Sequence, residues 1–230
     1  GPHPGYWSDA ETMALDLRDA VIAVRKNHPQ TPVYLLGSSM GAAVILAALG
    51  DGHIPSGDTI SGVILVGPAV RGPSTLNPFL RFALWFGAHT VPANNLTGEG
   101  LKIKPSDNIP MLRALGRDPL VIKSTRVDTL YGLVLLMGNA LEASQRLHHP
   151  ALVLGAGDDQ LVPGHAHEVL LELLQGERTE AVYPNGYHML LRDLQARVVW
   201  QDILAWIENH DAPLPSGLGR KIKSSRATVR

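Results

Sequence analysis

The sequence predicts an α/β fold, in which a mostly parallel sheet carries helices on both faces and an inserted helical cap interrupts the alternation. Four short segments are predicted to be strands, at residues 33–36, 61–66, 151–155 and 179–183. The first three are apolar runs, and the run at 61–66 has the few polar breaks typical of a strand that is covered on both faces. Segments with helical spacing alternate with these strands. Three of the predicted strands end in loops that carry a serine, an acid and a histidine. We therefore expect one domain over residues 1–210, with a site at the strand ends.

A helix precedes the first strand. Residues 8–11, Ser-Asp-Ala-Glu, form a capping-box pattern, so we expect the helix to run over residues 9–27. Pro29 lies just beyond its end. The apolar side chains repeat at helical spacing, and they are Met13, Leu17, Val21 and Val24.

A sharp turn follows the first strand. Residues 37–41 read Gly-Ser-Ser-Met-Gly and lead into a helix over 42–49. This is G-x-S-x-G at a strand-to-helix turn, which presents a serine nucleophile above the sheet. We expect Gly37 and Gly41 to leave room for close backbone packing, and Ser39 to lie at a helix N-terminus that favours negative charge. A glycine-rich turn with a capping serine is the alternative.

Partners for the serine follow in a characteristic order. The strand 151–155 runs into Asp158 and Asp159, and the strand 179–183 leads to His188. An acid that hydrogen-bonds an imidazole orients it and stabilises its cation. The chain order Ser, Asp, His on strand-end loops distinguishes one group of triad folds from others.

These segments carry a specific resemblance. G-S-S-M-G, G-D-D-Q-L-V-P and N-G-Y-H-M-L-L resemble the three triad blocks of the monoacylglycerol lipase and lysophospholipase group of α/β-hydrolases, over residues 1–208. The resemblance implies Ser39 as nucleophile, His188 as general base and acid, and Asp159 as the orienting acid, with Asp158 as its rival. The chain departs from the pattern at Ser38, where Glu is usual, and at Ala42, where Gly is common.

Residues 71–126 interrupt the alternation of strands and helices. An insertion of this length is often a functional lid, and the resemblance implies a cap over an acyl pocket. The core of the domain is then residues 1–70 and 127–210. The candidate substrate-binding side chains are aromatic, and they are Phe79, Phe82, Trp85 and Tyr131. The alternative is that these aromatics pack the cap's own core.

The chain returns to the sheet through a predicted helix over residues 127–143 and ends its core with another over 190–207. Its buried face is predicted to carry Val199, Ile203, Trp206 and Ile207. Residues 211–230 are basic and nearly free of apolar side chains, so we expect disorder there. A solvated end is the favoured interpretation, while peripheral contact with anionic lipid headgroups stays open.

Composition excludes several function classes. The chain has 230 residues, no cysteine and a net charge of −1, so disulfides, thiol catalysis and a general attraction to nucleic acid are excluded. No apolar run has the length of a membrane span, and we expect a cytoplasmic protein. His165 and His167 flank Ala166 near the acid loop, but we interpret them as solvated surface rather than metal ligands. We expect no metal and no cofactor.

The resulting hypothesis is a serine hydrolase of carboxylic esters, with monoacylglycerol or lysophospholipid as the favoured substrate. The Met40 N–H is expected to be one oxyanion donor. The resemblance implies a second donor on a His-Gly loop before Gly1, so we expect a chain that lacks the family's N-terminal strands. The alternatives are an esterase or amidase for another small acyl substrate, and a catalytically silent fragment.

Overall fold

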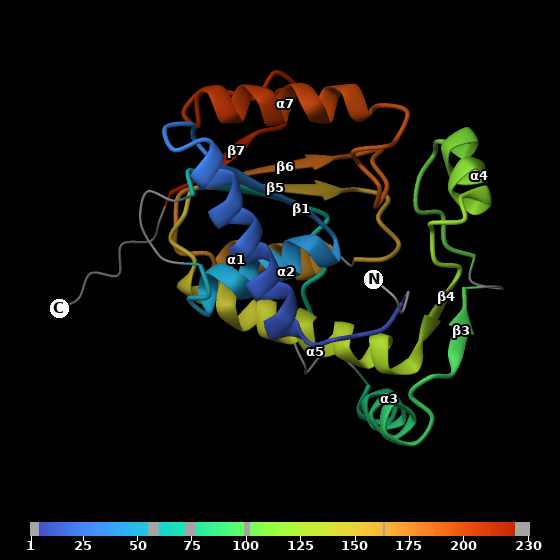
Figure 1. Cartoon of the computed structure of the whole chain (residues 1–230). Coiled ribbons are helices and arrows are strands. Elements are labelled where there is room, and N and C mark those ends of the chain that lie inside the picture. The colour runs from blue at the N-terminus through green and yellow to red at the C-terminus, as the bar shows by residue number, and fades with distance from the viewer. Residues whose placement is uncertain (1–4, 55–59, 72–76, 99–101, 163, 224–230) are drawn as a thin grey trace.

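A five-stranded sheet lies between two layers of helices (Figure 1). The structure is a computed structural model that describes residues 5–54, 60–71, 77–98, 102–162 and 164–223. The strand order is β1-β2-β5-β6-β7, and all neighbours are parallel except the last pair. The strands are β1 (Tyr34–Ser38), β2 (Gly62–Val66), β5 (Ala151–Ala156), β6 (Arg178–Tyr183) and β7 (Arg220–Ile222). The α/β class and the four parallel strands agree with the prediction, and β1 lies at an edge of this sheet.

Helices bury both faces of the sheet. One core packs against α1 (Ala10–Asn27), α2 (Met40–Gly50), α5 (Val127–Ala143) and α6 (Gly164–Leu173), and the other against α7 (Ala196–Glu208). Successive side chains of a strand point to opposite faces. In β2, Val63 and Leu65 belong to the first core, and Ile64 and Val66 to the second. This two-sided burial explains why the strands read as continuous apolar runs.

Helix α1 begins one residue later than the capping box predicts. Asp9 is the N-cap, and its carboxylate accepts from the Thr12 N–H at 2.5 Å. Glu11 therefore occupies the second helical position, where it cannot complete a box with Ser8. The Asp9 carboxylate therefore caps the helix alone, in place of the two reciprocal hydrogen bonds of a capping box.

The insertion between β2 and α5 has secondary structure of its own. It contains α3 (Pro78–Thr90), β3 (Asn95–Thr97), α4 (Ile109–Arg117) and β4 (Ser124–Arg126), and β3 pairs with β4 in a separate antiparallel ribbon. These elements lie to one side of the main sheet (Figure 1). No side chain of α3 is buried, so this helix presents its apolar residues at a surface.

The predicted terminal helix begins too early. The structure starts α7 at Ala196, followed on its buried face by Val199, Ile203 and Trp206. Residues before it form turns because buried Asp193 accepts from the Tyr187 N–H at 2.8 Å. A side chain that bonds local backbone in this way competes with helix formation.

The prediction of disorder from residue 211 is wrong for residues 211–223. Strand β7 pairs antiparallel with β6 and covers its edge. Arg220 pairs with Glu180 at 2.5 Å, and Lys221 with Asp211 at 2.9 Å. Two of the basic side chains that suggested a solvated tail, Arg220 and Lys221, thus pair with specific carboxylates. Residues 224–230 lie outside the described part of the chain.

Candidate active site

Ser39 lies on a strained turn between β1 and α2. Its φ of 53° and ψ of −116° make it the one non-glycine residue with positive φ in the described ranges. Such strain persists only where the surroundings enforce it. The Ser39 N–H donates to Val66 O at 2.9 Å, and its carbonyl accepts from the Ala69 N–H at 3.1 Å. The end of β2 therefore holds the Ser39 peptide from both sides.

The two glycines of the turn differ in their surroundings. A Cβ on Gly37 would lie 2.5 Å from Ala42 N and 2.6 Å from the Gly41 carbonyl carbon, so only glycine fits there. A Cβ on Gly41 would meet no atom within 4 Å. The prediction of close packing is confirmed for Gly37 and wrong for Gly41.

Met40 is the first residue of α2. Its N–H belongs to the first turn, whose N–H groups have no acceptor within the helix. The Ser39 side chain makes no capping hydrogen bond to this turn. The end of α2 therefore offers donors, and a positive dipole end, directly beside Ser39.

His188 is bound to Asp159. The Nδ1 atom lies 2.8 Å from Asp159 Oδ2, and both side chains are nearly buried. The other oxygen, Oδ1, accepts from the N–H groups of Leu161 and Val162 at 2.8 and 3.0 Å. Burial acts to raise the pKa of Asp159, but these hydrogen bonds outweigh it and the pKa is lowered. Asp159 is therefore an anion held in place on three sides.

Asp158 occupies a different position. Its N–H donates to Gly186 O at 2.9 Å, which ties the loop after β5 to the loop after β6. The His188 imidazole is hydrogen-bonded to the Asp159 carboxylate. Of the two acids left open by the sequence, the structure brings Asp159 to the histidine.

Gly67 links Ser39 and His188, and sequence reasoning missed it. It has a φ of +50°, and a Cβ there would lie 3.5 Å from His188 Nδ1. Gly67 directly follows Val66, the residue that accepts the Ser39 N–H. The imidazole thus packs on the same strand end that holds the serine. Within the described residues no hydrogen bond joins Ser39 Oγ to His188, and such bonds often form only when substrate binds.

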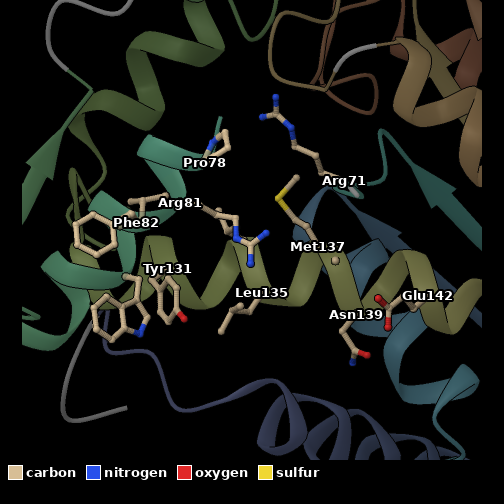
Figure 2. A pocket seen from close by; sticks show the side chains of 13 residues that line it. Arg71, Pro78, Arg81, Phe82, Tyr131, Leu135, Met137, Asn139 and Glu142 are labelled. Atoms are coloured by element: carbon tan, nitrogen blue, oxygen red, sulfur yellow. The ribbon is translucent and has the colours of Figure 1, made fainter. Parts of the chain in front are cut away.

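A cavity of about 630 Å³ lies between α3 and α5. Three of the four candidate substrate-binding aromatics line it, and they are Phe82, Trp85 and Tyr131. Figure 2 shows Phe82 and Tyr131 at one end, and Asn139 and Glu142 at the other.

Two features of this cavity depart from the expectation. Phe79 is absent from the lining and is 78% exposed, because it projects from the start of α3. The lining also contains none of Ser39, Asp159 and His188. Arg71 belongs to the lining and lies two residues beyond Ala69, whose N–H donates to Ser39 O.

The histidines of α6 differ from each other. His165 is exposed, as predicted, but His167 is buried and lies 3.1 Å from Glu180 Oε1. The prediction of a solvated His167 is wrong because α6 turns this side chain onto the sheet at Gly155. No group of three or more metal-ligating side chains occurs in the part of the chain that the structure describes. None of its described helices has the length and apolarity needed to cross a membrane.

Comparison with known families and sequences gives consistent matches. Residues 1–195 match the family model described as serine aminopeptidase, S33. A monoacylglycerol lipase of Mycolicibacterium smegmatis is 26% identical over 207 residues, covering 88% of this chain and 71% of that protein. The human monoglyceride lipase is 27% identical over 218 residues, covering 89% of this chain and 68% of that protein.

Solved structures resemble the chain in fold. A soluble variant of the Saccharomyces cerevisiae monoglyceride lipase, in complex with a substrate analog, superposes with a TM-score of 0.73 at 20% identity, over 91% of this chain and 72% of that one. The Paleococcus ferrophilus monoacylglycerol lipase gives a TM-score of 0.70 at 20% identity, over 88% and 76%. Identity this low supports the fold alone.

Proposed function

Because the chain belongs to the family described as serine aminopeptidase, S33, and has the α/β-hydrolase fold, we propose that it is a serine hydrolase of carboxylic esters. The observation that carries this proposal is the Asp159–His188 hydrogen bond of 2.8 Å, on the strand end that also holds Ser39. A nucleophile, a base and an acid that orients the base are the parts that acyl transfer needs.

The proposed reaction proceeds in two steps through an acyl-enzyme. His188 Nε2 takes the Ser39 hydroxyl proton as Oγ attacks the ester carbonyl carbon, and the same proton then passes to the departing alcohol. Water, deprotonated by His188, attacks the acyl carbon of the acyl-enzyme. The bond from that carbon to Ser39 Oγ breaks, the imidazolium returns the proton to Oγ, and the fatty acid leaves. Asp159 accepts from Nδ1–H throughout, which fixes the tautomer and stabilises the imidazolium. The Met40 N–H stabilises the oxyanion. No metal or organic cofactor takes part in these steps.

We propose monoacylglycerol as the substrate, with lysophospholipid as the second candidate within the lipid class. The names of the similar lipases support a lipid ester. The mostly apolar lining of the cavity between α3 and α5 also favours an acyl chain, although none of Ser39, Asp159 and His188 lines that cavity.

Helix α3 supports a lipid interface as the place of action. Phe79, Phe82 and Phe86 are each more than half exposed, and Leu80 and Trp85 nearly so. Contiguous apolar surface of this kind marks interaction sites. We therefore propose peripheral contact between this helix and a lipid surface.

The experiment that tests the catalytic proposal compares Ser39→Ala with Ser38→Ala. Ser38 is the exposed neighbour at the end of β1 and makes a matched control. We expect Ser39→Ala to lose fluorophosphonate labelling and to lower kcat for 1-monooleoylglycerol by roughly 10⁶, because a missing nucleophile disables the triad. Ser38→Ala should label normally.

The alternatives give different results in the same experiment. Turnover that survives in Ser39→Ala would contradict the assignment of the nucleophile. Labelling at Ser39 with turnover of short p-nitrophenyl esters or amides, but none of monoacylglycerol, would favour the general esterase or amidase. A wild type that neither labels nor turns over would favour the silent fragment.

A further inference from the structure

A short segment of the insertion, Lys104–Asn108, contacts the loop that carries His188. We call it the clasp segment. It precedes α4 and lies far from the histidine in sequence, yet its hydrogen bonds reach residues on both sides of His188. Nothing in the proposed acyl-transfer chemistry requires these contacts, so their role needs a separate explanation.

Asp193 lies at the centre of the contact. Its Oδ2 accepts from the Tyr187 N–H at 2.8 Å, and its Oδ1 accepts from the Ser106 hydroxyl at 2.5 Å. Ser106 is completely buried and Asp193 nearly so. A buried carboxylate is tolerated only with such partners. Ser106 Oγ in turn accepts from the Asn108 N–H at 3.1 Å, a hydrogen bond within the clasp segment.

The peptide on the other side of His188 is held as well. The Met189 N–H donates to Pro105 O at 2.9 Å. The backbone N–H groups immediately before and after His188 are therefore both fixed, one by Asp193 and one by the clasp segment itself. These two bonds restrict the backbone on either side of His188, from which its imidazole projects.

The clasp segment also reaches the acid loop. The Lys104 N–H donates to the side-chain oxygen of Gln160, next to Asp159, at 2.9 Å. The Lys104 ammonium donates to the Tyr187 hydroxyl at 3.0 Å and lies 4.4 Å from the centre of that ring. One segment of the insertion thus bonds both loops whose side chains form the Asp159–His188 pair.

We propose that Ser106 and Asp193 are positioning residues that couple the seating of the insertion to the orientation of His188. When the clasp segment is seated, the Tyr187 and Met189 peptides are fixed and the imidazole is held between Asp159 and Gly67. When it is displaced, the histidine loop loses the five hydrogen bonds that join it to the clasp segment. Besides the three given above, from Ser106, to Pro105 O and from Lys104, these are Asn108 Nδ2–H to Arg192 O and Leu194 N–H to Asp107 Oδ1, each at 2.9 Å. The inference deepens the proposed function and rests on it for its effect on turnover. Its geometric part is tested without turnover.

The test uses four variants and two controls. Asp193→Ala removes both acceptors, while Asp193→Asn keeps an acceptor for the Tyr187 N–H and offers an amide donor to Ser106 Oγ. Ser106→Ala removes the Ser106–Asp193 hydrogen bond and the acceptor of the Asn108 N–H, and leaves the Tyr187 N–H bonded to Asp193. Lys104→Met changes an exposed side chain and creates no buried void. It therefore keeps the proposal testable if the other variants fold poorly. The controls are Ser144→Ala, a buried hydroxyl bonded to Leu141 O, and Asp202→Asn, a buried carboxylate bonded to Tyr183 and the Ser216 N–H.

Two measurements report on the position of His188. The first is the low-field proton signal of the His188 Nδ1–H bonded to Asp159, followed by NMR in the unliganded protein. The second is kcat and KM for p-nitrophenyl butyrate, corrected for the folded fraction. We expect Asp193→Ala to lose the proton signal and to lower kcat by about 10²-fold, the effect of a misplacement of about 1 Å, with KM within about threefold.

The remaining variants should follow a definite order in kcat and in the strength of the proton signal. Asp193→Asn should restore most of kcat and the proton signal. Ser106→Ala and Lys104→Met should lie between Asp193→Ala and the wild type, and the controls should match the wild type. An unchanged signal in folded Asp193→Ala, or an equal loss in Asp202→Asn, would overturn the proposal. If the wild type shows the signal but no turnover, the proposed function fails while the signals of the variants still decide the positioning role.

Discussion

The backbone at Ser39 shows how one residue type decides a local conformation. Ser39 adopts a positive φ although it has a Cβ, and Gly37 permits this by letting the chain turn against the Ala42 N–H. The pattern G-x-S-x-G predicted a tight turn but could not distinguish the two glycines. Only the path of the following helix shows that the second glycine faces open space.

This difference gives a prediction at the residue scale. Gly37→Ala should lower the free energy of unfolding by about 1–3 kcal/mol, because the added methyl overlaps backbone atoms that cannot move independently. Gly41→Ala is the matched control and should leave stability unchanged or slightly raised, since alanine favours a helix. Urea denaturation of both variants checks this. Equal stabilities would mean that the turn relaxes without cost.

The candidate site was predictable to the extent that it follows strand ends. Ser39, Asp159 and His188 each follow a predicted strand, so their meeting at one edge of the sheet follows from the parallel strand order. Ser106 and Asp193 carry no such signal. They are polar residues in irregular segments, 87 positions apart, and only tertiary packing brings them together.

At the scale of the elements, the buried strands were predictable because burial on both faces leaves a continuous apolar run. The helix over residues 127–143 was predictable from the spacing of its apolar side chains. Strand β7 was not, because its residues are basic and exposed. Its place depends on Glu180, a carboxylate of β6 that also contacts His167 of α6. Partners this distant leave no local pattern.

The His167 contact gives a prediction about pH. Burial lowers the pKa of His167, and this outweighs the attraction of Glu180, which acts to raise it. The unfolded chain therefore binds more protons than the native one just below pH 6.5, so stability should fall as the pH is lowered through that region. Burial also lowers the pKa of His149 and His210, so His167 accounts for part of the effect.

The measurement is the free energy of unfolding between pH 5 and pH 8, a range chosen to bracket the usual pKa of histidine of about 6.5. His167→Gln should show a weaker pH dependence than the wild type. His165→Gln changes the exposed neighbour and should keep the full dependence. If the free energy of unfolding changed equally with pH in the two variants, the pKa of His167 would be the same in the folded and unfolded chain.

At the scale of the whole molecule, the insertion and the core share the cavity between α3 and α5. If acyl chains bind there, kcat/KM should rise with chain length by about fourfold for each buried CH₂, until the cavity is filled. Phe82→Ala and Trp85→Ala should flatten this rise. Phe79→Ala, on the same helix but outside the lining, should not. A series of p-nitrophenyl esters tests this, and a flat series in the wild type would contradict an acyl role for the cavity.

The connection between β2 and β5 has a consequence for how the protein folds. These strands are neighbours, with Val63 paired to Ala151, but the whole insertion and α5 lie between them in the chain. Closing so long a loop costs entropy before any contact repays it, which slows folding. Ser39 belongs to the unit before the crossover, and Asp159 and His188 to the unit after it. The three side chains therefore come together only when the two units dock, so recovery of esterase activity on refolding should follow that slow docking step rather than the earlier formation of helices.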